Sequence, residues 1–421
     1  MKPTLAFSIA LLLGTANAAD YYVSNTGDDD DPGSLSQPWQ SLQHAVDSVN
    51  PGDTVWVRGG NYAGAHMTQS GTEQARIALR AFPGESPAIV SDNAFTPDGL
   101  NLEGASYVTV EGFRVDGRGR AGIRAVLCQH VTIRANITDL NSRWGIFTGF
   151  CDDLLIEANI TSNSLIEHGI YVSNSADRPE VRNNLIFGNH ANGIHFNGDA
   201  SQGGDGIISD AIIEKNIIFD NGLGGGSGIN LDGVQDSVVR NNLLYDSHAS
   251  GISLYQIDGG GPSTGNKILN NTVLQDADGR WALNIQDGAI NNQVSNNILY
   301  NHHPFRGSID ISTDSLSGLV SDHNVVMHRF TTDGGTTILD LTQWQMVTAQ
   351  DSHSLIAVPT ELFEDATSDF RLPDDSPAVD SGMPLAEVSD DLLGTMRPLG
   401  LEFDIGAYEG NDVLFVDGLG D

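Results

Sequence analysis

A repeat of short apolar segments, each followed by an asparagine, limits what this chain can fold into more than any other feature. The central aliphatic residues of these segments recur 23 to 32 residues apart. A repeat of this size, with short strands and no helical periodicity, is typical of one turn of a parallel β-helix. The sequence therefore predicts an all-β solenoid. The anchor residues of the turns are Val110, Ile133, Ile156, Val181, Ile213, Val239, Ile268, Val294 and Val320.

The composition excludes several other classes. The 421 residues include 48 glycines, more than one in ten, which is incompatible with a bundle of long helices. The formal net charge is −35, and such an excess of carboxylates repels phosphate, so we expect no nucleic-acid partner. Hydrophobic residues make up 39% of the chain, which is enough to fill the core of a solenoid.

The N-terminal residues have the features of a secretory signal. Lys2 supplies the charge, an apolar run ends at Leu13, and small residues precede Ala19. We therefore expect a signal peptide at 1–18, a β-helix domain at 19–330, a C-terminal cap and closing segment at 331–410, and a tail at 411–421. No later segment has 18 uncharged apolar residues, so we expect no membrane span and a secreted monomer, extracellular or periplasmic.

Asparagine follows the anchor by three residues in seven consecutive turns. Stacked about 4.8 Å apart, identical amides form a hydrogen-bonded ladder. We interpret these residues as structural, and the two glycosylation sequons among them as inaccessible. The seven residues are Asn136, Asn159, Asn184, Asn216, Asn242, Asn271 and Asn297.

The two cysteines support this register. Cys128 and Cys151 are 23 residues apart, one turn in this part of the chain, so we expect them to be stacked neighbours. The spacing suits either a disulfide in an exported protein or two buried thiols.

A second strand in each turn begins with a small residue and an aliphatic one, as in Gly145-Ile146 and Gly193-Ile194. Side chains alternate along a strand, so the variable positions face outward and align in columns from turn to turn. These columns collect histidine, tyrosine, asparagine and aspartate on adjacent turns. The central patch is His168, Tyr171, His195, Asn197, Asn230, Asp232 and Tyr255.

Two loop insertions lie beside this patch, at 197–206 and 256–265. Long loops on a regular scaffold are commonly functional. We expect them to wall the patch into a cleft.

Both ends of the chain resemble pectate-lyase-like right-handed parallel β-helix proteins. The N-terminal motifs are Tyr21-Tyr22-Val23-Ser24, Pro38-Trp39 and Gly52-Asp53-Thr54-Val55; the C-terminal ones are Ser376-Pro377-Ala378, Asp380, Gly382, Arg397-Pro398 and Asp404-Ile405-Gly406-Ala407-Tyr408-Glu409. The resemblance covers about residues 20 to 410 and implies a right-handed coil with a short capping helix at Leu42 to Val49. The superfamily includes lyases, epimerases, hydrolases and binding proteins, so the fold alone does not give the activity.

The lysine and arginine pairs and the calcium-binding aspartates of the well-known pectate lyases have no clear match here. The patch is instead similar to the His and Tyr pair of alginate lyases and mannuronan epimerases. This resemblance implies an enzyme that removes the proton α to a uronate carboxyl group in a polysaccharide. His195 is then the expected base, and Tyr171 or Tyr255 the proton donor.

The remaining site residues are expected to bind the sugar chain. His168, Asn197, Asn230 and Asp232 contact the reacting sugar. Arg143, Arg280, Arg306, Trp144 and Trp281 hold its neighbours.

Two alternatives stay open: a glycoside hydrolase using Asp199, Asp205 and Asp232, and a non-catalytic carbohydrate-binding protein with Trp144, Phe147 and Trp281 as stacking platforms. No cofactor is expected to be required. If calcium binds, Asp199, Asp205 and Asp258 offer the hard oxygen ligands that it prefers.

Overall fold

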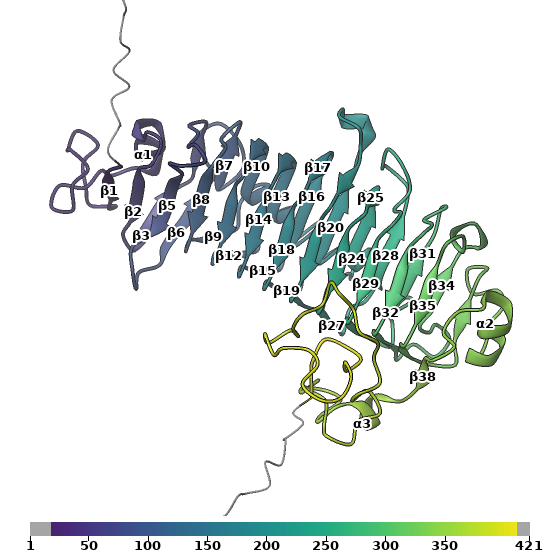
Figure 1. Cartoon of the computed structure of the whole chain (residues 1–421). Helices are drawn as coiled ribbons and strands as arrows, with labels where there is room; N and C mark the ends of the chain where they lie inside the picture. The colour runs from purple at the N-terminus through teal and green to yellow at the C-terminus, as the bar shows by residue number, and fades with distance from the viewer. Residues whose placement is uncertain (1–17, 411–421) are drawn as a thin grey trace, which may run out of the picture.

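The computed structural model describes residues 18–410, which form one right-handed parallel β-helix with short helices near its ends (Figure 1). Three long parallel sheets run along the coil, and each turn contributes one strand to each sheet. The fold class predicted from the repeat is therefore confirmed. The expected signal peptide, except for Ala18, and the expected tail lie outside the described residues.

The first sheet carries the anchor residues. Its strands, in spatial order, are β1 (Asp20–Val23), β2 (Thr54–Val57), β5 (Ile77–Ala81), β8 (Val108–Glu111), β11 (Thr132–Arg134), β14 (Leu155–Glu157), β18 (Glu180–Arg182), β22 (Ile212–Glu214), β26 (Val238–Arg240), β29 (Lys267–Leu269), β32 (Gln293–Ser295) and β35 (Val320–Asp322).

The second sheet follows the asparagine corner. Its strands are β3 (Gly60–Ala63), β6 (Pro87–Ser91), β9 (Arg114–Asp116), β12 (Ile137–Asp139), β15 (Ile160–Ser162), β19 (Leu185–Phe187), β23 (Ile217–Phe219), β27 (Leu243–Tyr245), β30 (Thr272–Gln275), β33 (Ile298–Asn301), β36 (Val325–Val326) and β38 (Leu355–Ile356).

The third sheet carries the polar columns and is called the site sheet below. Its strands are β4 (Ala65–Met67), β7 (Leu100–Glu103), β10 (Ala121–Gln129), β13 (Trp144–Asp152), β16 (Ile170–Ser173), β20 (Ile194–Asn197), β24 (Ser227–Asp232), β28 (Ser250–Tyr255), β31 (Leu283–Ile285), β34 (Ile309–Ile311) and β37 (Phe330–Thr331). A small sheet, β17 (Ala176–Asp177), β21 (Ile208–Ser209) and β25 (Val234–Gln235), lies between the site sheet and the first sheet in the chain.

The predicted register is correct for eight of the nine anchors. The eight anchors from Val110 to Val294 form an unbroken series, in which each one is the direct register partner of the one before it. The ninth is wrong by one residue, because Val294 pairs with Ser321 and Val320 is 55% exposed. Ser321 faces inward because its hydroxyl donates a 3.0 Å hydrogen bond to buried Asp351.

The asparagine ladder is confirmed. Each side-chain nitrogen donates to the side-chain oxygen of the asparagine one turn further on, over 2.9 to 3.1 Å, and the backbone N–H donates to the same oxygen. The ladder continues one turn beyond the prediction, to Asn324. Asn136 and Asn159 are buried in it, so their sequons are inaccessible.

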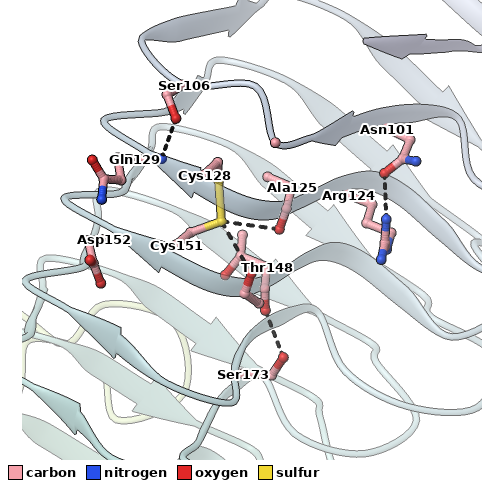
Figure 2. The surroundings of a disulfide bond; sticks show 12 residues. Asn101, Ser106, Arg124, Ala125, Cys128, Gln129, Thr148, Cys151, Asp152 and Ser173 are labelled. Atoms are coloured by element: carbon pink, nitrogen blue, oxygen red, sulfur yellow. Dashed lines mark hydrogen bonds between the residues drawn. A yellow bond between two sulfur atoms is a disulfide. The ribbon is translucent and has the colours of Figure 1, made fainter. Parts of the chain in front are cut away.

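The cysteines are register partners on β10 and β13, and they form a disulfide with a Cα–Cα distance of 4.6 Å (Figure 2). The cross-link joins two adjacent turns at the far end of the site sheet strands. Among the described residues there is no free cysteine.

The ends of the coil are covered in two ways. Helix α1 (Leu42–Ser48) buries Leu42, Ala45 and Val46 against the first turns, as expected. At the other end, α2 (Leu341–Thr348) stacks Trp344 on Phe330.

The closing segment differs from a simple end cap. After α3 (Pro359–Leu362), residues 363–410 run back along the side of the coil (Figure 1). The side chains of Asn241 and Asn270 donate to backbone carbonyls of this segment, and Lys215 pairs with Asp390 at 2.6 Å. No described helix is long and apolar enough to cross a bilayer.

Replacing Asn216 with Ala tests the ladder. The change removes the shared acceptor of the backbone and side-chain N–H groups of Asn184 and a donor to the Val181 carbonyl, which we expect to lower the free energy of unfolding by about 1 to 3 kcal/mol. Urea denaturation measures the change. Asn284→Ala, on the outer face of β31, is the control and should have little effect; equal losses in both variants would contradict the ladder's role.

Candidate active site

Two columns of polar side chains on the site sheet meet at β16, β20, β24 and β28. In the first column Tyr171, His195 and Asn230 are successive register partners. In the second, Asn197 pairs with Asp232, and Asp232 with Tyr255. The columns predicted from the sequence are therefore present, and the structure brings the central patch together.

The patch is more buried than a solvent-facing strand surface would be. Asn197, Asn230 and Asp232 are at most 5% exposed. The two inserted loops pair with each other beside the second column, through hydrogen bonds from Ala200 N to the Asp258 carbonyl (3.0 Å) and from Gly260 N to the Gly206 carbonyl (2.7 Å), and Asp258 contacts Asn197. The expectation that these loops wall the patch is met.

Asp232 holds one of these loops in place. Its carboxylate accepts the backbone N–H groups of Ile257, Asp258 and Gly259 at 2.8 to 3.1 Å. Burial raises the pKa of Asp232, and the three amide donors oppose this effect. Both carboxylate oxygens are thus occupied, which leaves Asp232 poorly placed to act as the acid or base of a hydrolase.

A chain of polar contacts connects two histidines. His195 Nδ1 lies 3.1 Å from His168 Nε2, and His168 Nδ1 accepts the backbone N–H of Asn192 at 3.2 Å. Burial lowers the pKa of His195 to about 3 and that of His168 well below its usual range, so both rings are neutral near pH 7. The other ring nitrogen of His195, Nε2, is buried and has no hydrogen-bond partner among the described residues.

Tyr171 stacks on His195, with ring centroids 4.9 Å apart and planes 10° from parallel. Its hydroxyl accepts a 3.0 Å hydrogen bond from Asn197, whose nitrogen also lies 3.4 Å from a carboxylate oxygen of Asp258. Burial raises the pKa of Tyr171 to about 12 and also raises that of Tyr255. Both phenols therefore keep their protons at neutral pH.

The tryptophans are not exposed stacking platforms. Trp144 is 8% exposed, because it packs on Phe147 and Tyr171 and donates to Glu167 at 2.6 Å. Trp281 is 6% exposed. Arg143 is ion-paired with Glu167. The expected sugar stacking on Trp144 and Trp281 is thus not supported, and Arg143 is already neutralised.

Three arginines at one edge of the site sheet have no carboxylate partner. Arg280, Arg306 and Arg329 immediately precede the last three strands of the sheet, β31, β34 and β37. Among the described lysines and arginines, only these three and Arg76, which donates to backbone carbonyls, lack an ion pair. We call Arg280, Arg306 and Arg329 the arginine row.

The arginine row creates a local positive field in an acidic protein. Burial, followed by Arg306 and Arg329, lowers the pKa of the neighbouring His303. Arg329 was missed in the sequence, because its strand is short and falls outside the regular repeat. Its Nη1 donates to the backbone carbonyls of His303 (2.6 Å) and Arg306 (3.3 Å).

A groove runs from the central patch to Arg280 and Asp287. Its volume is about 280 Å³, and Asn230, Tyr255 and Arg280 all line it, together with outward residues of β28 and β31. A larger cavity of about 590 Å³ lies between the second sheet and α3, where Tyr245 and Phe370 line it. That cavity is on a different sheet from the central patch.

The expected calcium ligands do not converge. Asp199 accepts the Ser201 N–H and Asp205 the Ile207 N–H, each as a local turn contact, while Asp258 faces Asn197. Asp205 also lines a different pocket, beside Phe150 and Asp177. The potential metal-ligand groups among the described residues lie elsewhere, at Asp322, His323 and His353 and at His248, Asp276 and Asp278. No chemistry is therefore assigned here to calcium.

The fold and this polar face together define a polysaccharide-lyase-like β-helix protein, and comparison with known proteins gives the family. The model of the family described as "Pel9A-like, right handed beta helix region" matches residues 21–252, more than half of the chain. The chain belongs to this Pel9A-like β-helix family.

One curated relative is similar in sequence over a short stretch, and two solved structures share the fold. Pectate lyase PEL9 of Emericella nidulans is 45% identical over 83 residues, which are 19% of this chain and 20% of that protein, so the match spans about a fifth of the relative's length. The crystal structure of pectate lyase Pel9A has a TM-score of 0.57 at 17% identity and covers 94% of this chain and 98% of its own. The A-module of the mannuronan C-5 epimerase AlgE6 of Azotobacter vinelandii has a TM-score of 0.52 at 15% identity and covers 76% of this chain and 94% of its own.

Burial of the histidines predicts that the free energy of unfolding decreases at acid pH. A folded pKa of about 3 for His195, against about 6.5 in the unfolded chain, means that the unfolded state binds the proton first as the pH falls. The stability is complete above pH 6.5 and decreases by up to about 1.4 kcal/mol per pH unit towards pH 3. His195→Gln removes this titration, so urea denaturation should show a shallower acid-side loss in the variant; identical pH dependence would contradict a neutral buried ring.

Proposed function

We propose that this protein is an exported lyase or C5-epimerase that acts on a uronic-acid-containing polysaccharide at the central patch. The observation that carries the proposal is the combination of buried proton-transfer groups with the arginine row on one sheet. Proton removal from the carbon next to a carboxylate needs a base, a donor and positive charge for the carboxylate. The site sheet offers candidates for the base and the donor at the central patch, and the arginine row offers positive charge for carboxylates further along the same sheet.

The arginine row offers local attraction to a polyanion, although the protein as a whole is acidic. The net charge is −35, but Arg280, which has no carboxylate partner among the described residues, lines the groove together with Asp287. Nearby charges act more strongly than distant ones, which salt screens beyond about 10 Å. A uronate chain lying in the groove would have its reacting sugar at Tyr171 and His195 and its neighbouring carboxylates at Arg280 and Arg306.

The reaction follows from these groups. The base takes the proton at C5, and the electron pair forms the C4–C5 double bond while the bond from C4 to the glycosidic oxygen breaks. A tyrosine hydroxyl, Tyr171 or Tyr255, gives its proton to the departing oxygen. In an epimerase the same donor returns a proton to the opposite face of C5. Two groups are placed to accept the first proton: His195, and the carboxylate of Asp258 beside Asn197.

Product analysis tests the reaction class. The purified protein is incubated with polygalacturonate, alginate, rhamnogalacturonan and neutral glucans. Elimination gives an unsaturated sugar that absorbs in the ultraviolet, and epimerisation changes the uronate composition without cleavage. Reducing ends without unsaturation would indicate a hydrolase, and binding without any product would indicate a carbohydrate-binding protein; either result overturns the proposal.

His195→Ala and Tyr171→Phe test the location of the site. We expect each to lower turnover by about 10² to 10⁴, the usual contribution of a proton-transfer group. Tyr171→Phe keeps the ring that stacks on His195, so its melting temperature should stay close to that of the wild type. Wild-type turnover in both variants would show that the reaction takes place elsewhere.

Arg306→Gln tests the role of the arginine row. Loss of one charge near a bound carboxylate should raise KM about three- to tenfold and leave kcat nearly unchanged, because the contact is the same in the ground state and the transition state. The control is Arg178→Gln, an exposed arginine that pairs with Asp153 away from the groove. Equal effects of the two variants on KM would contradict a specific role for the row.

A further inference from the structure

The donor and the acceptor of each hydrogen bond around His195 can be assigned, starting from the backbone N–H of Ser227. A backbone N–H can only donate, so the 2.5 Å contact from Ser227 N identifies the side-chain oxygen of Asn192. The side-chain nitrogen of Asn192 must then face His168 Nδ1, at 3.2 Å. The backbone N–H of Asn192 donates to the same ring nitrogen, which is therefore an acceptor without a proton.

This arrangement determines where both histidines carry their protons. A neutral imidazole has one N–H, so the proton of His168 is on Nε2 and points at His195 Nδ1, 3.1 Å away. His195 Nδ1 is then also an acceptor, and its single proton is on Nε2, which is buried and has no hydrogen-bond partner among the described residues. The reverse arrangement would place a proton on His168 Nδ1, directly opposite the two N–H groups of Asn192.

The same network orients the next residue of the column. Asn230 donates its side-chain nitrogen to Asn192 Oδ1 over 3.0 Å, so its oxygen is turned away. That oxygen is buried and, like His195 Nε2, has no partner among the described residues. His195 and Asn230 are register partners, so an N–H donor and a carbonyl acceptor lie on adjacent turns. A sugar hydroxyl can accept from the N–H and donate to the carbonyl, whereas a carboxylate can only accept and would be repelled by the carbonyl oxygen.

Asp258 has two properties that a base needs and His195 lacks: an exposed side chain and an oxygen that can accept a proton. Its backbone N–H is held by Asp232 over 2.8 Å, so its position at the loop tip is fixed. Its side chain is exposed, and the contact of Oδ2 with Asn197 is its one hydrogen bond among the described residues. The same Asn197 nitrogen contacts the Tyr171 hydroxyl, so the carboxylate lies beside the proposed proton donor.

We infer that His195 is a fixed N–H donor to a hydroxyl group of the substrate and that Asp258 is the base. The inference rests on the proposed function and reverses the expectation that His195 accepts the proton. In the balanced step, the Asp258 carboxylate takes the proton from C5, and Tyr171 gives its own proton to the departing oxygen. Tyr171 then regains a proton from water, and Asp258 loses its proton to water.

The first test needs no substrate. The full-length protein is labelled with ¹⁵N in its histidine rings, and two-bond ¹H–¹⁵N correlation spectra report which nitrogen carries the proton. His195→Gln and a His168→Gln variant assign the signals. We expect Nε2–H for both rings at neutral pH. An Nδ1–H form of His195 overturns the inference whatever the activity of the protein.

The second test separates a donor from a base. Glutamine places an amide N–H close to the position of Nε2 but has no basic nitrogen. With the polysaccharide that the product panel identifies, His195→Gln should keep turnover within about fivefold of the wild type, while His195→Ala loses about 10² or more. Asp258→Asn should lose about 10² to 10⁴.

Asp205→Asn, on the other inserted loop and in a different pocket, should have turnover close to the wild type. His195→Gln as inactive as His195→Ala, or Asp258→Asn as active as the wild type, overturns the assignment of roles. If no polysaccharide on the panel is converted, the proposed function and the base assignment fail together, and the NMR spectra still decide whether His195 is a donor.

Discussion

Parallel pairing between successive turns is the constraint on which the rest of this structure depends. Each strand must satisfy its backbone hydrogen bonds with the turn before and the turn after, about 4.8 Å away. A side chain at one register position is therefore stacked on its counterpart in the next turn. This rule gives the asparagine ladder inside the coil, the disulfide between β10 and β13, and the polar columns of the site sheet.

The site arises where this regularity is interrupted. The insertions after β20 and β28 add loops that pair with each other and contact the second column at Asn197 and Asp232. Burial changes the chemistry of the same residues: the histidines become neutral, the tyrosines keep their protons, and unpaired polar atoms are left for a ligand. The Asp232 carboxylate is the link between scaffold and loop, since it binds three consecutive loop amides.

Electrostatics show why the net charge is a poor guide to the substrate. Most described arginines and lysines are ion-paired, either between neighbouring turns, as Arg178 with Asp153, or with the closing segment, as Lys215 with Asp390. Three of the four exceptions lie at the last strands of the site sheet, and the fourth, Arg76, donates to backbone carbonyls beside the first sheet. Under the proposed function, a polyanion in the groove would be attracted by Arg280 and its neighbours more than it is repelled by distant carboxylates, because salt screens the distant charges.

The sequence alone determined the solenoid, its register and the columns that form the patch, because a stacked coil repeats its pattern along the chain at readable intervals. It failed by one residue at Val320 and missed Arg329, where the last turns shorten and the repeat ends. It also could not show that Trp144 and Trp281 are buried, that Asp232 is bound to loop amides, or that His195 presents an N–H. These properties depend on loops and hydrogen-bond directions that join residues far apart in the chain, and only the tertiary structure decides them.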